Sequence, residues 1–145
     1  MTLIEILVSM AVIAVLLAGL FAVSSYIETQ IKIRRTQTTM NLLVAALDAY
    51  RLHQSYDTKQ KFPLPVDGND LSYNSLAVEP EAKNLLDQLN RKAMKKKDED
   101  VRFIDGWGNE FIYQYAPGDN APVIISAGPD QKFATTQDNI VSKGL

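Results

Sequence analysis

Glu5 is the side chain whose type and position most clearly suggest a specific chemistry. It lies at the start of an apolar run, and no ionisable residue follows it from Ile6 to Val23. A carboxylate inside a membrane-length apolar segment is costly, so it usually marks a function and has a partner. The nearest candidate partner is the α-amino group of Met1, in the same chain or in a neighbouring copy. The chemistry predicted here is an ion pair.

A second interpretation of Glu5 requires no partner. Acidic side chains are favoured in the first turn of a helix, where unpaired N–H groups carry a partial positive charge. Glu5 would also be tolerated in the interfacial zone of a membrane. The residues alone leave these alternatives open.

The sequence provides few groups for catalysis. Its single histidine, His53, falls at the end of an amphipathic segment, where a packing or surface role is expected. The sequence has no glycine-rich phosphate loop, no paired histidine ligands and no nucleophile elbow. It also lacks cysteine, which excludes thiolate metal sites, thiol nucleophiles and disulfides. We therefore expect a protein that is not an enzyme.

Length and charge narrow the class further. The 145 residues allow one small domain besides the apolar run. The formal net charge of −2 makes nucleic acid an unexpected partner.

Residues 2–53 are predicted to form one continuous helix. No proline occurs before Pro63, and the only earlier glycine is Gly19. Residues 1–25 should form a transmembrane or filament-core half, because a helix of about 20 apolar residues spans a bilayer. The amphipathic remainder belongs to a head, residues 26–145. Its predicted inner face comprises Ile27, Ile31, Arg34, Thr38, Leu42, Ala45, Ala46, Ala49, Tyr50 and His53.

The rest of the head is predicted to contain a loop, a second helix and a sheet. Turn signals fill the stretch from His53 to Pro80. Pro80 suits the first turn of a helix with an inner stripe of Leu85, Leu86, Leu89 and Ala93. That helix should end in the basic run Lys95–Lys97, which is either a solvated helix end or a contact for a polymer or an anionic partner.

Three short β-branched and aromatic runs separated by glycine and proline turns indicate an antiparallel meander. They are Val101–Ile104, Glu110–Tyr115 and Val123–Ser126. We expect this sheet to bury Ile112, Val123, Ile125 and Trp107. The predicted fold class is therefore α+β, with one long N-terminal helix, a second helix and a three-stranded antiparallel sheet.

The N-terminus resembles that of type IV pilins and type II secretion pseudopilins. Their mature chains begin Phe-Thr-Leu-Ile-Glu before an apolar helix, and residues 2–5 here are Thr-Leu-Ile-Glu. Met1 stands where the family has phenylalanine. It is either the natural residue after leader cleavage or a start codon that replaces a removed leader.

Two further segments resemble the major, G-type pseudopilin. Residues 105–111, Asp-Gly-Trp-Gly-Asn-Glu-Phe, are similar to its Asp-x-Trp-Gly-Asn-x-Tyr/Phe motif. Residues 126–130 and 138–140 resemble its C-terminal loop. The resemblance implies a pilin-like fold and a subunit that polymerises through its N-terminal helix, with Met1 and Glu5 as assembly residues.

The resemblance also implies a calcium site in the C-terminal loop. Asp130 and Asp138 match the acidic positions of the family, and Ala127 would supply a carbonyl oxygen. Gln131 and Ala134 stand where the family has glycines, which restricts backbone conformations with positive φ. The alternative is a metal-free loop in which the aspartate side chains accept hydrogen bonds.

The function implied is that of a pseudopilus subunit for type II secretion. Alternatives are a major pilin of extracellular type IV fibres and a minor pilin with a ligand- or DNA-binding head. The implied partners are further copies of the chain, an inner-membrane assembly platform, a prepilin peptidase and minor pseudopilins. The implied location is the bacterial inner membrane as a single-pass protein, then a periplasmic or extracellular filament.

Overall fold

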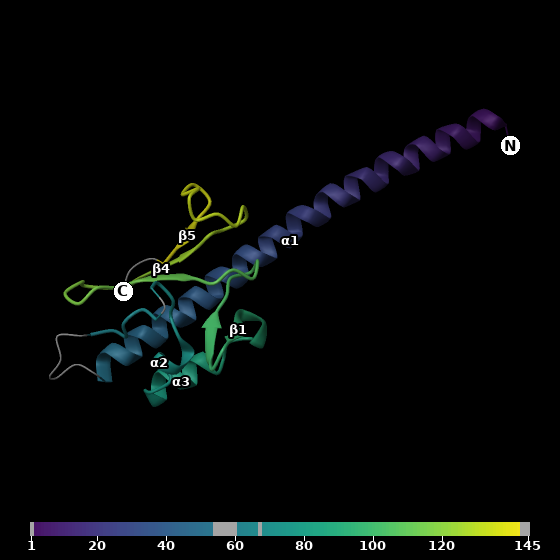
Figure 1. Ribbon diagram of the computed structural model, residues 1–145. Coiled ribbons are helices and arrows are strands. Elements are labelled where there is room, and N and C mark those ends of the chain that lie inside the picture. Colours follow the sequence, from purple (N-terminus) through teal and green to yellow (C-terminus); the bar gives the residue numbers. More distant parts are fainter. Residues whose placement is uncertain (1, 54–60, 67, 143–145) are drawn as a thin grey trace. The chain divides into compact units, whose positions relative to one another are not determined.

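The computed structural model describes residues 2–53, 61–66 and 68–142, without the side chains of residues 21 and 22 (Figure 1). The chain is α+β, and the predicted long helix is confirmed as α1 (Leu3–His53). Short helices α2 (Tyr73–Leu76), α3 (Pro80–Leu86) and the 3-10 turn η1 (Arg91–Ala93) follow. The strands are β1 (Met94–Lys97), β2 (Asp100–Phe103), β3 (Ile112–Gln114), β4 (Val123–Ser126) and β5 (Ile140–Val141).

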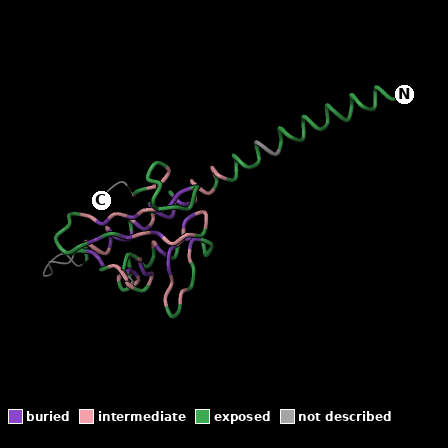
Figure 2. The backbone as a smooth tube through the Cα atoms, turned by 45° about the horizontal axis from the view of Figure 1, so that its top comes forward, coloured by how far each residue is buried: buried purple, intermediate pink, exposed green. Residues whose placement is uncertain are grey.

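The chain divides into two compact units, Met1–Ile31 and Lys32–Leu145. The described part of the first unit is helical from Leu3 onward, and its described residues from 2 to 28 are all exposed (Figure 2). Within the described residues, α1 is the one helix long and apolar enough to cross a membrane. The described side chains of the first unit thus form no core of their own.

The second unit has a core built on one face of α1. Buried α1 residues include Thr36, Met40, Leu43 and Leu47. The predicted inner face was therefore right only in part. Ala46 and Ala49 are buried, and Leu42 and Tyr50 pack against the core, whereas Ile27, Ile31, Arg34, Thr38, Ala45 and His53 are exposed. Both faces carry apolar residues at helical spacing, so periodicity alone does not select the face that packs inward.

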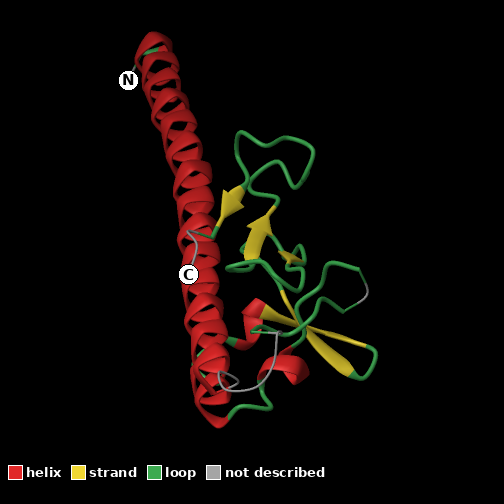
Figure 3. Ribbon diagram, turned by 90° about the vertical axis from the view of Figure 1, so that its left-hand side faces the viewer, coloured by secondary structure: helices red, strands yellow, loops and turns green. Residues whose placement is uncertain are grey.

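The three-stranded antiparallel sheet has the order β3-β4-β5 and lies beside the part of α1 that belongs to the second unit (Figure 3). Ile112 pairs with Ile125, and Ser126 pairs with Ile140. Val101–Ile104 was predicted as the first strand of this meander. The run does contribute to a strand, β2, but β2 pairs with β1, and one antiparallel bridge joins Ile104 to Glu110 before β3. The third strand is Ile140–Val141, at the far side of the C-terminal loop.

The segment around the basic run forms a separate hairpin of β1 and β2. The prediction of a helix continuing to the lysines was wrong, because α3 ends at Leu86 and Lys95–Lys97 belong to β1. Leu86, Leu89 and Ala93 are buried as predicted, so their spacing could not distinguish one helix from a helix followed by a 3-10 turn.

Lys97 is held within the head. Its ammonium lies 3.3 Å from carboxylate oxygens of both Asp70 and Glu110. These two carboxylates raise the pKa of Lys97 above its ordinary value. Lys95 and Lys96 are exposed.

The buried face of the β3-β4-β5 sheet is also the opposite of the predicted one. Tyr113, Ile124 and Ser126 are buried, whereas Ile112 and Ile125 are only partly so. Apolar residues occupy both faces of these strands, so alternation does not select one. The hydroxyl of Tyr113 donates to the carbonyl of Pro63 at 2.9 Å, which satisfies the polar end of this buried ring.

Candidate functional site

Glu5 closes the first turn of α1. Its carboxylate oxygen Oε2 accepts hydrogen bonds from the backbone N–H of Thr2 at 2.8 Å and from the Thr2 hydroxyl at 3.2 Å. The backbone N–H of Glu5 in turn donates to the Thr2 carbonyl at 3.1 Å. Glutamate reaching back to the residue three positions earlier is the pattern of a capping box. The first-turn interpretation of Glu5 therefore describes this structure.

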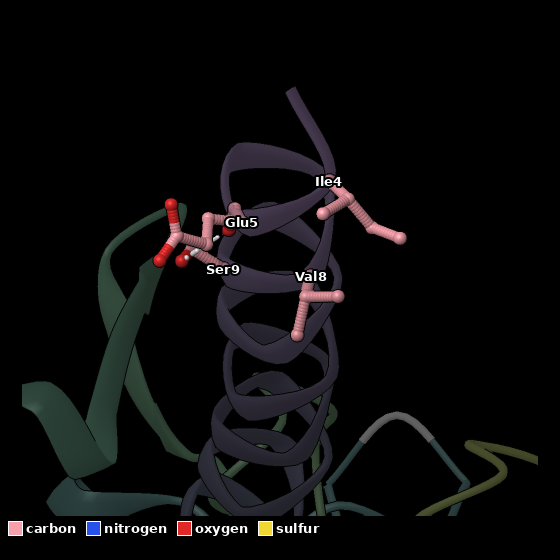
Figure 4. A pocket seen from close by; sticks show the side chains of 4 residues that line it. All are labelled: Ile4, Glu5, Val8 and Ser9. Atoms are coloured by element: carbon pink, nitrogen blue, oxygen red, sulfur yellow. Dashed lines mark hydrogen bonds between the residues drawn. The ribbon is translucent and has the colours of Figure 1, made fainter. Parts of the chain in front are cut away.

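The surroundings of Glu5 are apolar and open. A shallow surface depression is lined by Ile4, Glu5, Val8 and Ser9 (Figure 4). The Ser9 hydroxyl donates to the Glu5 carbonyl at 2.7 Å, so this donor is already used within the helix. Among the described residues that line the depression, Glu5 is the one with a charged side chain, and its carboxylate lies at the surface, where a cation from outside can reach it. Met1, the predicted partner, lies outside the described residues.

The C-terminal loop brings Asp130 and Asp138 together. The backbone N–H of Asp130 donates to Oδ2 of Asp138 at 3.1 Å. The carboxylate of Asp130 accepts from the backbone N–H of Lys132 at 2.8 Å. This hydrogen bond, with one from the Thr135 side chain, lowers the pKa of Asp130. Both carboxylates thus accept hydrogen bonds inside the loop.

The loop also holds oxygens that lack a partner. Oδ1 of Asp138 and Oδ1 of Asn139 are buried and accept no hydrogen bond from the described residues. The Asn139 amide is oriented by its Nδ2, which donates to the Phe133 carbonyl at 3.2 Å. Carboxylate and amide oxygens are what calcium prefers, so this donor set fits the cation. Among the described residues, no group of three or more acidic, histidine or cysteine side chains is arranged to hold a metal ion. Backbone carbonyls such as that of Ala127 and water would therefore have to complete the shell.

The two ends of the C-terminal loop meet where the backbone of Gly128 lies against the backbone of Asp138. Gly128 has φ 70°, and a Cβ there would collide with the carbonyl of Asp138. Gln131 has φ 59° and is one of two described non-glycine residues with positive φ, the other being Asp98. The resemblance expects glycine at positions 131 and 134. Gln131 adopts the left-handed conformation that favours glycine, whereas Ala134 does not.

Gln131→Gly is therefore expected to stabilise the chain by about 0.5–1 kcal/mol. The left-handed conformation costs a side-chain-bearing residue about 1–2 kcal/mol, and the added unfolded-state freedom of glycine offsets part of the gain. Thermal unfolding of the full chain in detergent, followed by circular dichroism, measures the change. Ala134→Gly is the control and should give no gain, and equal gains from both variants would contradict the assignment.

Asp105 forms a buried polar cluster that sequence reasoning missed. Its side chain is 2% exposed. Oδ1 accepts from the backbone N–H groups of Trp107 and Asn109, both at 2.9 Å, and Oδ2 accepts from the Ser126 hydroxyl at 2.7 Å. The aspartate at the start of a Gly-Trp-Gly-Asn turn was the available signal, because aspartate often accepts from the backbone two residues on. Trp107, expected in the core, is only partly buried.

Gly106 seats this turn directly on α1. Its backbone N–H donates to the hydroxyl of Thr36 at 2.8 Å, and that hydroxyl donates to the Lys32 carbonyl at 2.9 Å. A Cβ at position 106 would collide with the Lys32 backbone. Glycine is therefore required here by close approach and not by its φ angle.

His53 lies away from both candidate sites. Its Nδ1 is 3.7 Å from a Glu79 carboxylate oxygen, and its Nε2 is 3.6 Å from one of Glu81. The side chain is about half exposed.

No protein-family model matches the chain, and comparison with curated proteins and with solved structures gave no match. The functional interpretation consequently depends on the sequence motifs and on the geometry described above.

Proposed function

We propose that this protein is a structural subunit that polymerises through its N-terminal helix into a pseudopilus or pilus filament, as its resemblance to type II secretion pseudopilins implies. The supporting observation is the apolar N-terminal unit, whose described side chains are exposed from residue 2 to residue 28. Burying an exposed leucine or isoleucine contributes roughly 1.5–3 kcal/mol. The large apolar residues available for this are Leu3, Ile4, Ile6, Leu7, Val8, Met10, Val12, Ile13, Val15, Leu16, Leu17, Leu20 and Val23.

The same helix would serve two environments in turn. Before assembly it would anchor the subunit in the bacterial inner membrane as a single span. After assembly it would pack against copies of itself in the centre of a filament, with the heads outside. The assembly platform, prepilin peptidase and minor pseudopilins implied by the resemblance would carry out the transfer.

Glu5 would set the register of neighbouring subunits. In the single chain its carboxylate is bound to Thr2, whose hydrogen bonds are local and exposed. In a filament the carboxylate would instead pair with the Met1 amine of a neighbour. An unpaired charge inside an apolar bundle is strongly unfavourable, so only the alignment that pairs the two groups would be stable.

Electron microscopy of the full chain after detergent removal tests the polymer directly. The expected result is a helical filament composed of this chain alone, with helices in the centre. Chains that remain single in a bilayer under all conditions in which pseudopilins assemble would contradict the proposal.

We also propose that the C-terminal loop binds calcium through Asp130, Asp138, Asn139 and the Ala127 carbonyl. The cation would supply positive charge that joins the two ends of the loop. Its support is the pair of partnerless oxygens on Asp138 and Asn139. Tight binding to the folded state alone would stabilise the chain by about 2.7 kcal/mol at a hundredfold excess over Kd.

Calcium is accordingly expected to raise the melting temperature of the full chain in detergent by several degrees. Asp138→Asn should remove most of that rise, because it loses charge at the loop end. Asp119→Asn is the matched control, since Asp119 is an exposed acid in a different turn, where it accepts from the Ala116 N–H at 2.9 Å. Scanning calorimetry with and without calcium decides, and an unchanged melting temperature in the parent chain would remove the site.

A further inference from the structure

A continuous series of buried contacts leads from α1 to the C-terminal loop. It begins at Thr36, whose hydroxyl accepts from the Gly106 N–H at 2.8 Å. The adjacent Asp105 accepts from the Ser126 hydroxyl at 2.7 Å. Ser126 in turn accepts from the Gly128 N–H at 3.2 Å. The Thr36, Asp105 and Ser126 side chains are buried, at 0%, 2% and 0% exposed.

The last member of the series touches the far end of the loop. Gly128 is packed so closely on the Asp138 carbonyl that no Cβ would fit. Asp138 then accepts from the Asp130 N–H at 3.1 Å through Oδ2, while its Oδ1 is buried without a partner. A cation or donor that binds Oδ1 of Asp138 therefore acts on the same residue whose backbone Gly128 contacts.

We propose that this network, defined as Thr36, Asp105, Gly106, Ser126 and Gly128, is a relay that couples the state of the C-terminal loop to α1. Ser126 and Gly128 are positioning residues that hold the loop ends in place. The coupling between the loop and α1 needs no cation. Only the expectation that calcium binding acts through it rests on the proposed calcium site.

The chemistry of the network favours such coupling. Buried hydrogen bonds in a low-dielectric interior polarise one another, so a network behaves as more than the sum of its pairs. Asp105 accepts on both oxygens, so a shift in Ser126 changes the carboxylate that also holds the turn on which Gly106 sits. Gly106 is joined to α1 by its hydrogen bond to Thr36, and it lies so close to the Lys32 backbone that a Cβ would not fit.

A double-mutant cycle of Thr36→Val and Ser126→Ala tests the relay without metal. The two substitutions act at opposite ends of the network, and each removes one hydroxyl. If the network is one unit, the double variant loses less melting temperature than the sum of the single losses, by roughly 3 °C or more. The full chain in detergent is used throughout.

Thr39→Val is the matched control for the cycle. Thr39 is a buried threonine of α1, 3% exposed, and no hydrogen bond joins it to the network among the described residues. Its effect should add to that of Ser126→Ala. Additive losses for the Thr36 pair as well would overturn the relay.

Hydrogen exchange with calcium ion as the probe tests the response. Calcium is expected to slow exchange in the loop and also at backbone amides of α1 near Thr36. In Ser126→Ala the loop should still respond while α1 does not. An α1 response that persists in this variant would overturn the relay. No response anywhere in the parent chain would instead contradict the calcium site, and the metal-free cycle then decides the coupling.

Discussion

Glu5→Gln is expected to abolish filament formation while membrane insertion continues. Glutamine can still accept from the Thr2 N–H, so it keeps the capping box in which Glu5 is found. It cannot neutralise the Met1 amine of a neighbouring subunit, and that charge would be left unpaired in the apolar core. Pelleting and negative-stain microscopy measure assembly, and resistance to alkaline extraction measures insertion.

Glu5→Ala completes the comparison by removing both the charge and the cap. If pairing between subunits is the role of Glu5, the alanine and glutamine variants fail alike, with filaments reduced to background. If capping is the role, the glutamine variant assembles normally and only alanine fails. Normal filaments from both variants would refute any role of Glu5 in assembly.

Asp105→Ala is expected to lower the free energy of unfolding by about 3 kcal/mol or more. The substitution leaves the buried Ser126 hydroxyl and the N–H groups of Trp107 and Asn109 without their acceptor. Each unsatisfied buried donor costs about 1–3 kcal/mol. Thermal or denaturant unfolding of the full chain in detergent, followed by near-ultraviolet circular dichroism, provides the measurement.

Asp105→Asn is the matched control for this prediction. Its amide oxygen can serve the two backbone N–H groups, and its amide nitrogen can donate to the Ser126 hydroxyl oxygen. We therefore expect a loss of about 1 kcal/mol, clearly below that of alanine. Equal losses would show that the carboxylate charge, and not the set of hydrogen bonds, stabilises this cluster.

The long helix could be predicted because its signals are local. Residues 2–53 contain no proline and one glycine, and the apolar run is long enough to be recognised from composition. A first-turn position for Glu5 was one of the alternatives for the same reason, whereas its hydrogen bonds from Thr2 were not predicted. Pairing with another copy of the chain is not encoded within one helical turn and stays a prediction.

The arrangement of the head could not be predicted in the same way. Strands β3 and β4 are apolar on both faces, so the alternation did not identify Tyr113 and Ile124 as the buried residues. Strand β5 is only Ile140–Val141, too short to stand out before its pairing with Ser126 is known. The β1-β2 hairpin could not be predicted from the apolar spacing. Leu89 and Ala93 would be buried in a continuous helix, and they are also buried where the chain passes through η1 into β1.

The candidate calcium site in the C-terminal loop could likewise be predicted only in part. The residues Asp130 and Asp138 were identified from motifs, but their contact depends on Gly128 meeting the Asp138 backbone ten positions later. The Asp105 network joins residues as far apart as Thr36 and Gly106. The local turn pattern accounts for the Trp107 and Asn109 N–H groups that Asp105 accepts, but no local pattern predicts its distant donor, the Ser126 hydroxyl.

The sequence by itself determined the long helix, the α+β class and the isolated acid at the helix start, because periodicity, composition and capping act between residues a few positions apart. Only the tertiary structure decided which face of α1 is buried, which strand completes the sheet and how Asp105 is satisfied. Those outcomes depend on the side chains that distant segments bring to the same place, and on the cost of leaving a buried polar group there without a hydrogen-bond partner.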